Sequence, residues 1–167
     1  KEIYRLQGNK SAYIEQLWKL VLEQSAGDLD IYKELKAQYS EKEWLIKREE
    51  LFKKLPANAH IDRLYKEEKL YDRLLAYVLK SSGLYAVQSY ENVLKKEYPK
   101  QILSKYQDEV NKMASCTGNR KHYADLVALL RRMKQIKGGS EIVETIVEEW
   151  KIKYRNRPAM MDELSKL

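Results

Sequence analysis

The chain has 167 residues, enough for one domain with a sizeable hydrophobic core. A charged fraction of 34% with only six glycines and three prolines is typical of a soluble, strongly helical protein. No apolar run approaches the roughly 18–20 residues that cross a bilayer, and the N-terminus lacks the apolar core of a signal peptide. The single cysteine, Cys116, excludes an internal disulfide and favours a reducing compartment. We therefore expect a cytoplasmic protein without a membrane partner.

Hydrophobic periodicity predicts helices along the whole chain, because apolar residues recur at spacings of three and four. Residues 1–8 resemble the end of an earlier helix. The remaining predicted helices cover residues 9–25, 29–39, 40–55, 59–79 (as one helix or two), 84–98, 99–113, 119–137, 140–154 and 158–164.

Local signals support several of these boundaries. Ser40 and Glu43 have the spacing of a capping box. The polar residues 66–69 separate two apolar patches and mark a possible break in the fourth predicted helix. The glycines at 138–139 end one helix, and Ser140 is the expected N-cap of the next.

Short connections between amphipathic helices favour antiparallel neighbours. Gly8-Asn9 precedes Tyr13 by the same interval that Gly118-Asn119 precedes Tyr123, which suggests repeated helical hairpins. We predict an all-α fold of about nine or ten helices, arranged as a right-handed αα superhelix of TPR-like stacked hairpins. The whole of residues 1–167 is expected to form one helical repeat domain, and we expect it to be a piece of a longer protein.

Possible chemistry centres on one sequence neighbourhood. Cys116, His122 and Asp125 could supply part of a zinc site, and Cys116 with His122 could form a nucleophile pair. The simpler interpretation is that His122 pairs with Asp125 on a helix surface. Adjacent acids such as Glu67-Glu68 diverge on a helix and are interpreted as solvated faces. We therefore predict no catalytic, metal or cofactor-binding residue, and a protein that is not an enzyme.

The net charge of +7 is concentrated toward the C-terminus, where residues 118–167 hold 11 basic and 7 acidic residues. Two basic runs end consecutive predicted helices, where the helix dipole favours cations. In an antiparallel hairpin these runs lie at opposite ends. They are nevertheless the candidate nucleic-acid contacts: Arg131, Arg132, Lys134, Lys151, Lys153, Arg155 and Arg157.

The chain also has 13 tyrosines, more than ordinary composition provides. Most fall on predicted core faces, but Tyr77 and Tyr85 do not, and these two are the candidate partner-binding residues.

One stretch resembles a known family. The C-terminal segment consists of a helix from Tyr123 to Met133 followed by Tyr154, Arg155, Arg157, Pro158, Ala159, Met161, Glu163 and Leu164. It is similar to the C-terminal helical region of bacterial SWIM zinc-finger proteins, and the similarity covers residues 118–167. The Cys-x-Cys and Cys-x-His zinc motif of that family is absent from this chain. The resemblance implies a helical scaffold in a protein associated with nucleic-acid or partner binding.

The sequence therefore predicts a non-catalytic helical-repeat scaffold that binds a protein partner or other domains of its parent chain. The alternative is a nucleic-acid-binding accessory domain that uses the C-terminal basic helices.

Overall fold

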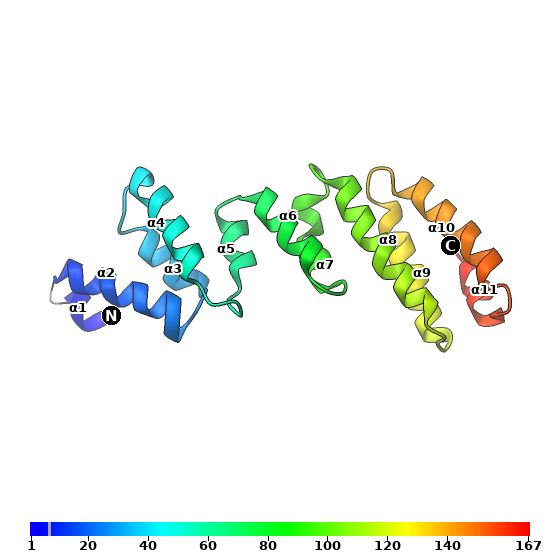
Figure 1. Ribbon diagram of the computed structural model, residues 1–167, viewed down its shortest axis with the longest axis horizontal. Coiled ribbons are helices and arrows are strands. Elements are labelled where there is room, and N and C mark those ends of the chain that lie inside the picture. Colours follow the sequence, from blue (N-terminus) through cyan, green and yellow to red (C-terminus); the bar gives the residue numbers. More distant parts are fainter. Residues whose placement is uncertain (7) are drawn as a thin grey trace. The chain divides into compact units, whose positions relative to one another are not determined.

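The computed structural model describes residues 1–6 and 8–167 (Figure 1). Over these residues the chain forms eleven α-helices and one π-helical turn, with no strand. They are α1 (Glu2–Leu6), α2 (Lys10–Lys19), the π-helical η1 (Leu20–Gln24), α3 (Leu29–Lys36), α4 (Glu41–Lys54), α5 (Ile61–Glu67), α6 (Tyr71–Lys80), α7 (Tyr85–Leu94), α8 (Pro99–Ser115), α9 (Arg120–Lys134), α10 (Gly139–Lys153) and α11 (Pro158–Leu164). The prediction of an all-α fold is confirmed. None of the helices in the described part of the chain is long and apolar enough to cross a membrane.

The described residues form one α-helix more than the upper end of the expected nine or ten, and the additional helix is α1. Residues that resembled the end of an earlier helix form α1, and the fourth predicted helix is divided into α5 and α6. The break lies in the predicted polar stretch. Lys69 has a φ of 56°, a left-handed conformation that an α-helix does not continue through. Glu68 is therefore held in the turn between two helices.

The described residues form two compact units, residues 1–74 and 75–167, and the boundary lies inside α6. Each unit has its own buried apolar side chains. That residues 1–167 make a single domain, and that their helices follow a right-handed TPR-like superhelix, stay predictions.

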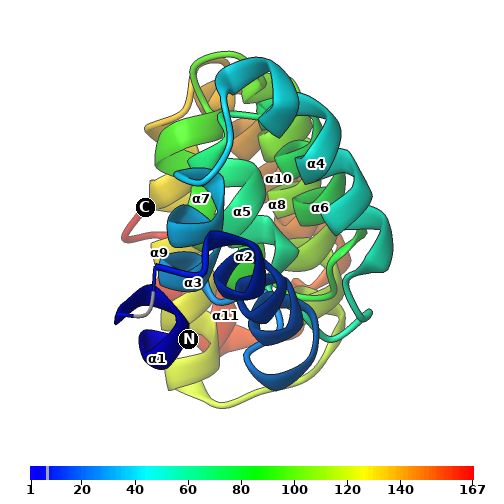
Figure 2. The same cartoon turned by 90° about the vertical axis from the view of Figure 1, so that its left-hand side faces the viewer.

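Unit 1 is organised around an aromatic core. α2 packs on α3 and on η1, and α3 packs on α5 (Figure 2). The buried Tyr32 of α3 meets Trp44 of α4 edge-on, with ring centroids 5.1 Å apart, and lies parallel to Phe52 at 6.4 Å. The capping box predicted for α4 is present. The Ser40 hydroxyl accepts from the backbone N–H of Glu43, and the Glu43 carboxylate accepts from the backbone N–H of Ser40.

In unit 2 consecutive helices pack on each other. α7 packs on α8, α8 on α9, and α9 on both α10 and α11. Because the chain reverses at each turn, the α7–α8 and α9–α10 turns lie at one end of this unit, and the α8–α9 and α10–α11 turns lie at the other (Figure 1).

The α9–α10 turn differs from the prediction in one respect. Ser140 is not the N-cap of α10, because that helix begins at Gly139 and its cap is Gly138, with a φ of 83°. A Cβ at Gly139 would lie 1.8 Å from the carbonyl oxygen of Met133. The backbone of the turn therefore needs glycine at 139. Because α10 begins at Gly139, Ser140 is the second residue of the helix and not its N-cap.

Candidate partner-binding site

The carboxylate of Glu68 is the polar centre of unit 1. Its Oε1 atom accepts hydrogen bonds from Lys36 Nζ at 2.8 Å, Trp44 Nε1 at 3.0 Å and the Tyr32 hydroxyl at 3.2 Å. Its Oε2 atom accepts one from Arg48 Nη1 at 3.1 Å. The α5–α6 turn thus supplies one carboxylate that connects α3 and α4.

Burial determines the electrostatics of this centre. The side chain of Glu68 is 5% exposed, and that of Arg48 is 16% exposed. Burial alone raises the pKa of the Glu68 carboxyl, but the hydrogen bonds from Lys36, Trp44 and Arg48 outweigh it and lower the pKa below its usual value. Burial and the neighbouring carboxylate raise the pKa of Tyr32, so this hydroxyl stays protonated and donates.

The charged groups continue as a chain of alternating sign. Arg48 Nε lies 3.5 Å from Glu49 Oε1, and Arg73 Nη1 donates to both oxygens of Glu49 at 3.0 and 2.9 Å. With Lys36 and Glu68 at the other end, the chain joins three cations through two carboxylates. This network ties α3, α4 and the start of α6 to the α5–α6 turn, which is a structural role.

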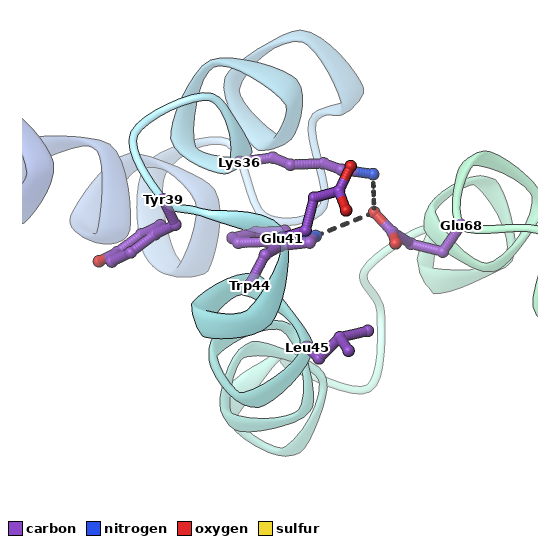
Figure 3. Close-up of a pocket in the computed structure, with 6 residues that line it drawn as sticks. All are labelled: Lys36, Tyr39, Glu41, Trp44, Leu45 and Glu68. Carbon is purple, nitrogen blue, oxygen red and sulfur yellow. Dashed lines mark hydrogen bonds and ion pairs between the residues drawn. The ribbon is translucent and has the colours of Figure 1, made fainter.

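A hollow of about 420 Å³ lies beside this network (Figure 3). It is lined by Lys36, Tyr39, Glu41, Trp44, Leu45 and Glu68. The Tyr39 and Trp44 rings stack at 6.0 Å and form its aromatic wall. Glu41 enters from the first turn of α4.

A second hollow of about 410 Å³ lies between α2 and α4. It is lined by Ser11, Ile14, Glu15, Trp18, Leu22, Lys47, Glu50 and Lys54. The ring of Trp18 is fixed because its Nε1 donates to the Tyr39 hydroxyl at 2.9 Å. On α2, Ile14, Trp18 and Leu22 follow one another at intervals of four residues, so they line one side of that helix and its π-helical extension.

Two large apolar side chains of α4 are exposed to solvent, and one of them, Leu45, also lines the first hollow. Leu45 is 52% exposed and Ile46 is 72% exposed. We use the name "α4 face" for Leu45, Ile46 and the two hollows. Exposed apolar side chains next to aromatic-walled hollows are typical of protein–protein contact surfaces.

The neighbourhood of Cys116 and His122 does not bring ligands together. Cys116 is exposed, and its sulfur lies 3.8 Å from the carbonyl oxygen of Lys112. His122 Nε2 lies 3.1 Å from the carbonyl oxygen of Met113, so the ring faces the end of α8 and not the predicted partner Asp125. Among the described residues no group of three or more His, Cys, Asp or Glu side chains could hold a metal ion.

Several of the predicted nucleic-acid contacts are occupied by bonds inside unit 2. Arg132 bonds the buried Glu91 at 2.7 Å, and Arg131 donates to the carbonyl oxygen of Lys166 at 2.6 Å. Arg157 donates to the carbonyl oxygen of Ala114 at 2.7 Å and stacks at 4.3 Å on the ring of Tyr154.

The remaining predicted contacts are divided between the two ends of unit 2. Lys153 lies 5.4 Å from the Tyr154 ring, and Arg155 is exposed just beyond α10. Lys134 and Lys151 line one hollow of about 280 Å³ together with Glu144 and Glu148. Lys134 of the first basic run and Lys151 of the second thus line the same hollow, and the nucleic-acid contacts stay a prediction.

The two predicted partner-binding tyrosines also differ from each other. Tyr85 is 84% exposed at the start of α7, whereas Tyr77 in α6 is half-buried.

Glu68 is the residue that sequence reasoning misplaced. The Glu67-Glu68 pair was interpreted as a solvated face, which is wrong for Glu68, because its side chain is almost fully buried. The available signal was its position inside the polar stretch 66–69, where a helix break turns one carboxylate inward. Arg48, on the apolar side of its helix, was the matching cation.

Fold and site together define an all-α protein in which a buried carboxylate ties three helices of unit 1 together and in which α4 exposes two large apolar side chains, Leu45 and Ile46. Comparison of the chain with family models, curated proteins and solved structures finds no match.

Proposed function

We propose that this protein is a non-catalytic helical-repeat scaffold, and that the α4 face of unit 1 binds a segment of a protein partner or of another domain of its parent chain. The observation that carries this proposal is the exposure of Leu45 and Ile46 next to two hollows with aromatic side chains in their walls. Similarity to SWIM zinc-finger proteins, TPR-like repeats and a cytoplasmic location are compatible with it and stay predictions.

The chemistry of the face favours an apolar segment over a charged small molecule. Glu68, the buried carboxylate nearest the first hollow, already accepts four hydrogen bonds. Charged groups satisfied in this way have little left to offer a ligand. Leu45, Ile46 and the Tyr39 ring, in contrast, lose water-exposed apolar surface when a partner covers them, which stabilises a complex by about 25 cal/mol per Å².

The expected partner is an amphipathic helical segment. Helices that bind in such grooves present apolar anchors at intervals of three and four residues, and the hollows on either side of α4 could accept side chains of this kind. Charged residues at the rim of the second hollow, such as Glu15 and Lys47, would then contact the polar edge of the segment.

A displayed library of random 15-residue segments, selected on the purified protein, tests the proposal. We expect the enriched segments to share apolar residues at helical spacing, and synthetic copies to bind more than tenfold more weakly when Leu45→Ser and Ile46→Ser are combined. The matched control combines Leu79→Ser and Ile152→Ser, which removes one exposed leucine and one exposed isoleucine from unit 2. Equal loss of binding in both variants, or a selection without enrichment, would reject the α4 face as the site.

A further inference from the structure

Almost all of the net charge of the protein belongs to unit 2. Residues 75–167 hold 17 basic and 11 acidic residues, an excess of six, whereas residues 1–74 hold 15 and 14, an excess of one. In the sequence, the excess of basic over acidic residues is concentrated toward the C-terminus. In the structure, basic residues from two separate segments of unit 2 lie at the same end of that unit.

The α7–α8 and α9–α10 turns meet at one end of unit 2 (Figure 1). The contact is direct, because a Cβ placed on Gly139 would lie 3.3 Å from Cδ2 of Leu103. Leu103 belongs to the first turns of α8, which begins at Pro99. Two segments about 40 residues apart in the chain therefore share one surface.

Five lysines project from these two turns, and we name them the lysine end: Lys95, Lys96, Lys100, Lys134 and Lys137. Residues 95–100 and 134–141 contain two acidic residues, Glu97 and Glu141, so the local excess is three positive charges. In the described part of the chain none of the five lysine side chains forms a hydrogen bond or ion pair. Glu144 lines the same hollow as Lys134 without bonding it.

The lysine end contrasts with the opposite end of unit 2. There Arg157 is held by carbonyl oxygens at the end of α8, and Arg120 bonds Asp162 and Glu163. Arg157 and Arg120 therefore stabilise the fold, whereas among the described residues no ion pair holds the five side chains of the lysine end. The α8 and α10 helices begin at the lysine end and α7 and α9 end there, so the opposite helix dipoles offset one another and the positive potential of this surface comes from the lysines.

The surface has no apolar component. The exposed large apolar side chains of the described residues are Ile3, Tyr4, Leu6, Leu45, Ile46, Leu79, Tyr85 and Ile152, and none belongs to residues 95–100 or 134–141. Binding to a membrane surface combines basic residues with an inserted apolar face, which is missing here. Lysines in and beside two short turns, without an exposed large apolar anchor, match the regularly spaced phosphates of a nucleic acid.

We propose that the lysine end binds nucleic acid through its phosphate backbone, without sequence preference. This surface is distinct from the α4 face and shares only Lys134 with the contacts predicted from the sequence. In this proposal the nucleic acid contacts the turns at one end of unit 2. It does not lie along the C-terminal basic helices, as the sequence alone suggested.

Fluorescence anisotropy with a labelled 20-nucleotide single strand and a 20-base-pair duplex tests the proposal. In one variant all five lysines of the lysine end are changed to Gln. The control variant carries Lys80→Gln, Lys112→Gln, Lys121→Gln, Lys151→Gln and Arg155→Gln, which are exposed cations of unit 2 outside the lysine end. Both variants lose five positive charges, so overall charge is matched.

We expect the lysine-end variant to bind at least tenfold more weakly at low salt, and the control to stay within about threefold of the unmodified protein. The slope of log K against log salt concentration should also fall by about 0.9 for each duplex phosphate contact that is lost. Equal weakening in both variants would show that only net charge matters and would overturn the proposal. So would the absence of binding by the unmodified protein at 50 mM salt, or tighter binding to polyglutamate or to vesicles of anionic lipid.

Failure of this proposal is distinguishable from failure of the α4 face. Leu45→Ser with Ile46→Ser changes no charge, so that variant should bind nucleic acid as the unmodified protein does. A parallel loss of nucleic-acid binding in that variant would contradict the separate surfaces.

Discussion

Replacing Glu68 by Gln removes a buried charge while keeping the size of the side chain. The pair of Glu68 and Arg48 is almost fully buried, and breaking such a pair by removing one partner destabilises a protein by about 3–5 kcal/mol. Lys36 is 42% exposed and can be solvated instead, so its contribution stays below about 1 kcal/mol. The amide oxygen of Gln still accepts from Trp44. We therefore expect Glu68→Gln to destabilise unit 1 by about 3 kcal/mol.

Glu67→Gln is the matched control. Glu67 precedes Glu68 in the chain and pairs with Lys33 at 3.4 Å, but both side chains are substantially exposed. Exposed pairs contribute about 0–1 kcal/mol, so the control should change stability by less than about 0.5 kcal/mol. The two variants differ only in which neighbouring carboxylate loses its charge.

Hydrogen exchange resolved by residue is the suitable assay, because a chain with two compact units need not unfold in one step. A loss of 3 kcal/mol should increase the exchange rate of protected amides in α3 and α4 by about a hundredfold. Adding Arg48→Met to Glu68→Gln should restore part of the protection, since no unpaired guanidinium then remains buried. Equal exchange in Glu67→Gln and Glu68→Gln, or strictly additive effects of Glu68→Gln and Arg48→Met, would refute the reasoning.

The same pair has a defined pH dependence. Because the pKa of Glu68 is lowered in the folded state, its stabilisation is fully present above the unfolded pKa of about 4.5. It is lost as the pH falls through the folded pKa. The difference between Glu68→Gln and the unmodified protein should accordingly be constant near neutral pH and shrink below about pH 4.5.

Three further predictions concern single residues. The hydrogen bond to the Glu34 carboxylate raises the pKa of Tyr13 to about 12. Absorbance titration at 295 nm should therefore show one late-titrating tyrosine fewer in Tyr13→Phe. The stability that this group contributes should be fully present below pH 10 and disappear as the pH rises through 12. Arg157→Lys should destabilise unit 2 by about 1–2 kcal/mol in urea unfolding, because lysine cannot both stack and bond the carbonyl oxygens, whereas the exposed neighbour Arg155→Lys should be neutral. Gly139→Ala should destabilise by more than about 2 kcal/mol because its Cβ meets a carbonyl oxygen, and Gly83→Ala, which has a positive φ in open space, by about 1 kcal/mol.

Helices and their caps could be predicted because the signals are local. The capping box of Ser40 and Glu43 and the break within residues 66–69 both depend on neighbours within four residues. The periodicity that places Tyr123 and Leu130 on one face also needs no tertiary information. Fold class follows from such signals.

The sites could not be predicted because they depend on residues that are distant in the chain. Glu68 bonds Lys36 and Arg48, which are 32 and 20 residues away, and nothing near Glu68 identifies them as partners. Ser140 was misassigned for a related reason. A backbone contact between Gly139 and Met133 decides where α10 begins, and a preference for serine at N-caps does not report on it.

The charged side chains of the two units differ in whether they are paired. The two proposed binding activities should therefore respond differently to salt concentration. Unit 1 neutralises its buried cations in the network around Glu68 and exposes Leu45 and Ile46, so its complexes should depend on apolar area. Unit 2 leaves its lysine end unpaired, so its complexes should release counterions. Raising sodium chloride from 50 to 200 mM should therefore weaken nucleic-acid binding strongly and leave binding of an apolar segment almost unchanged. If both kinds of complex weakened to the same extent, binding at the α4 face would also have to depend on electrostatic contacts. That result would contradict the proposal that Leu45 and Ile46 bind the partner through apolar area.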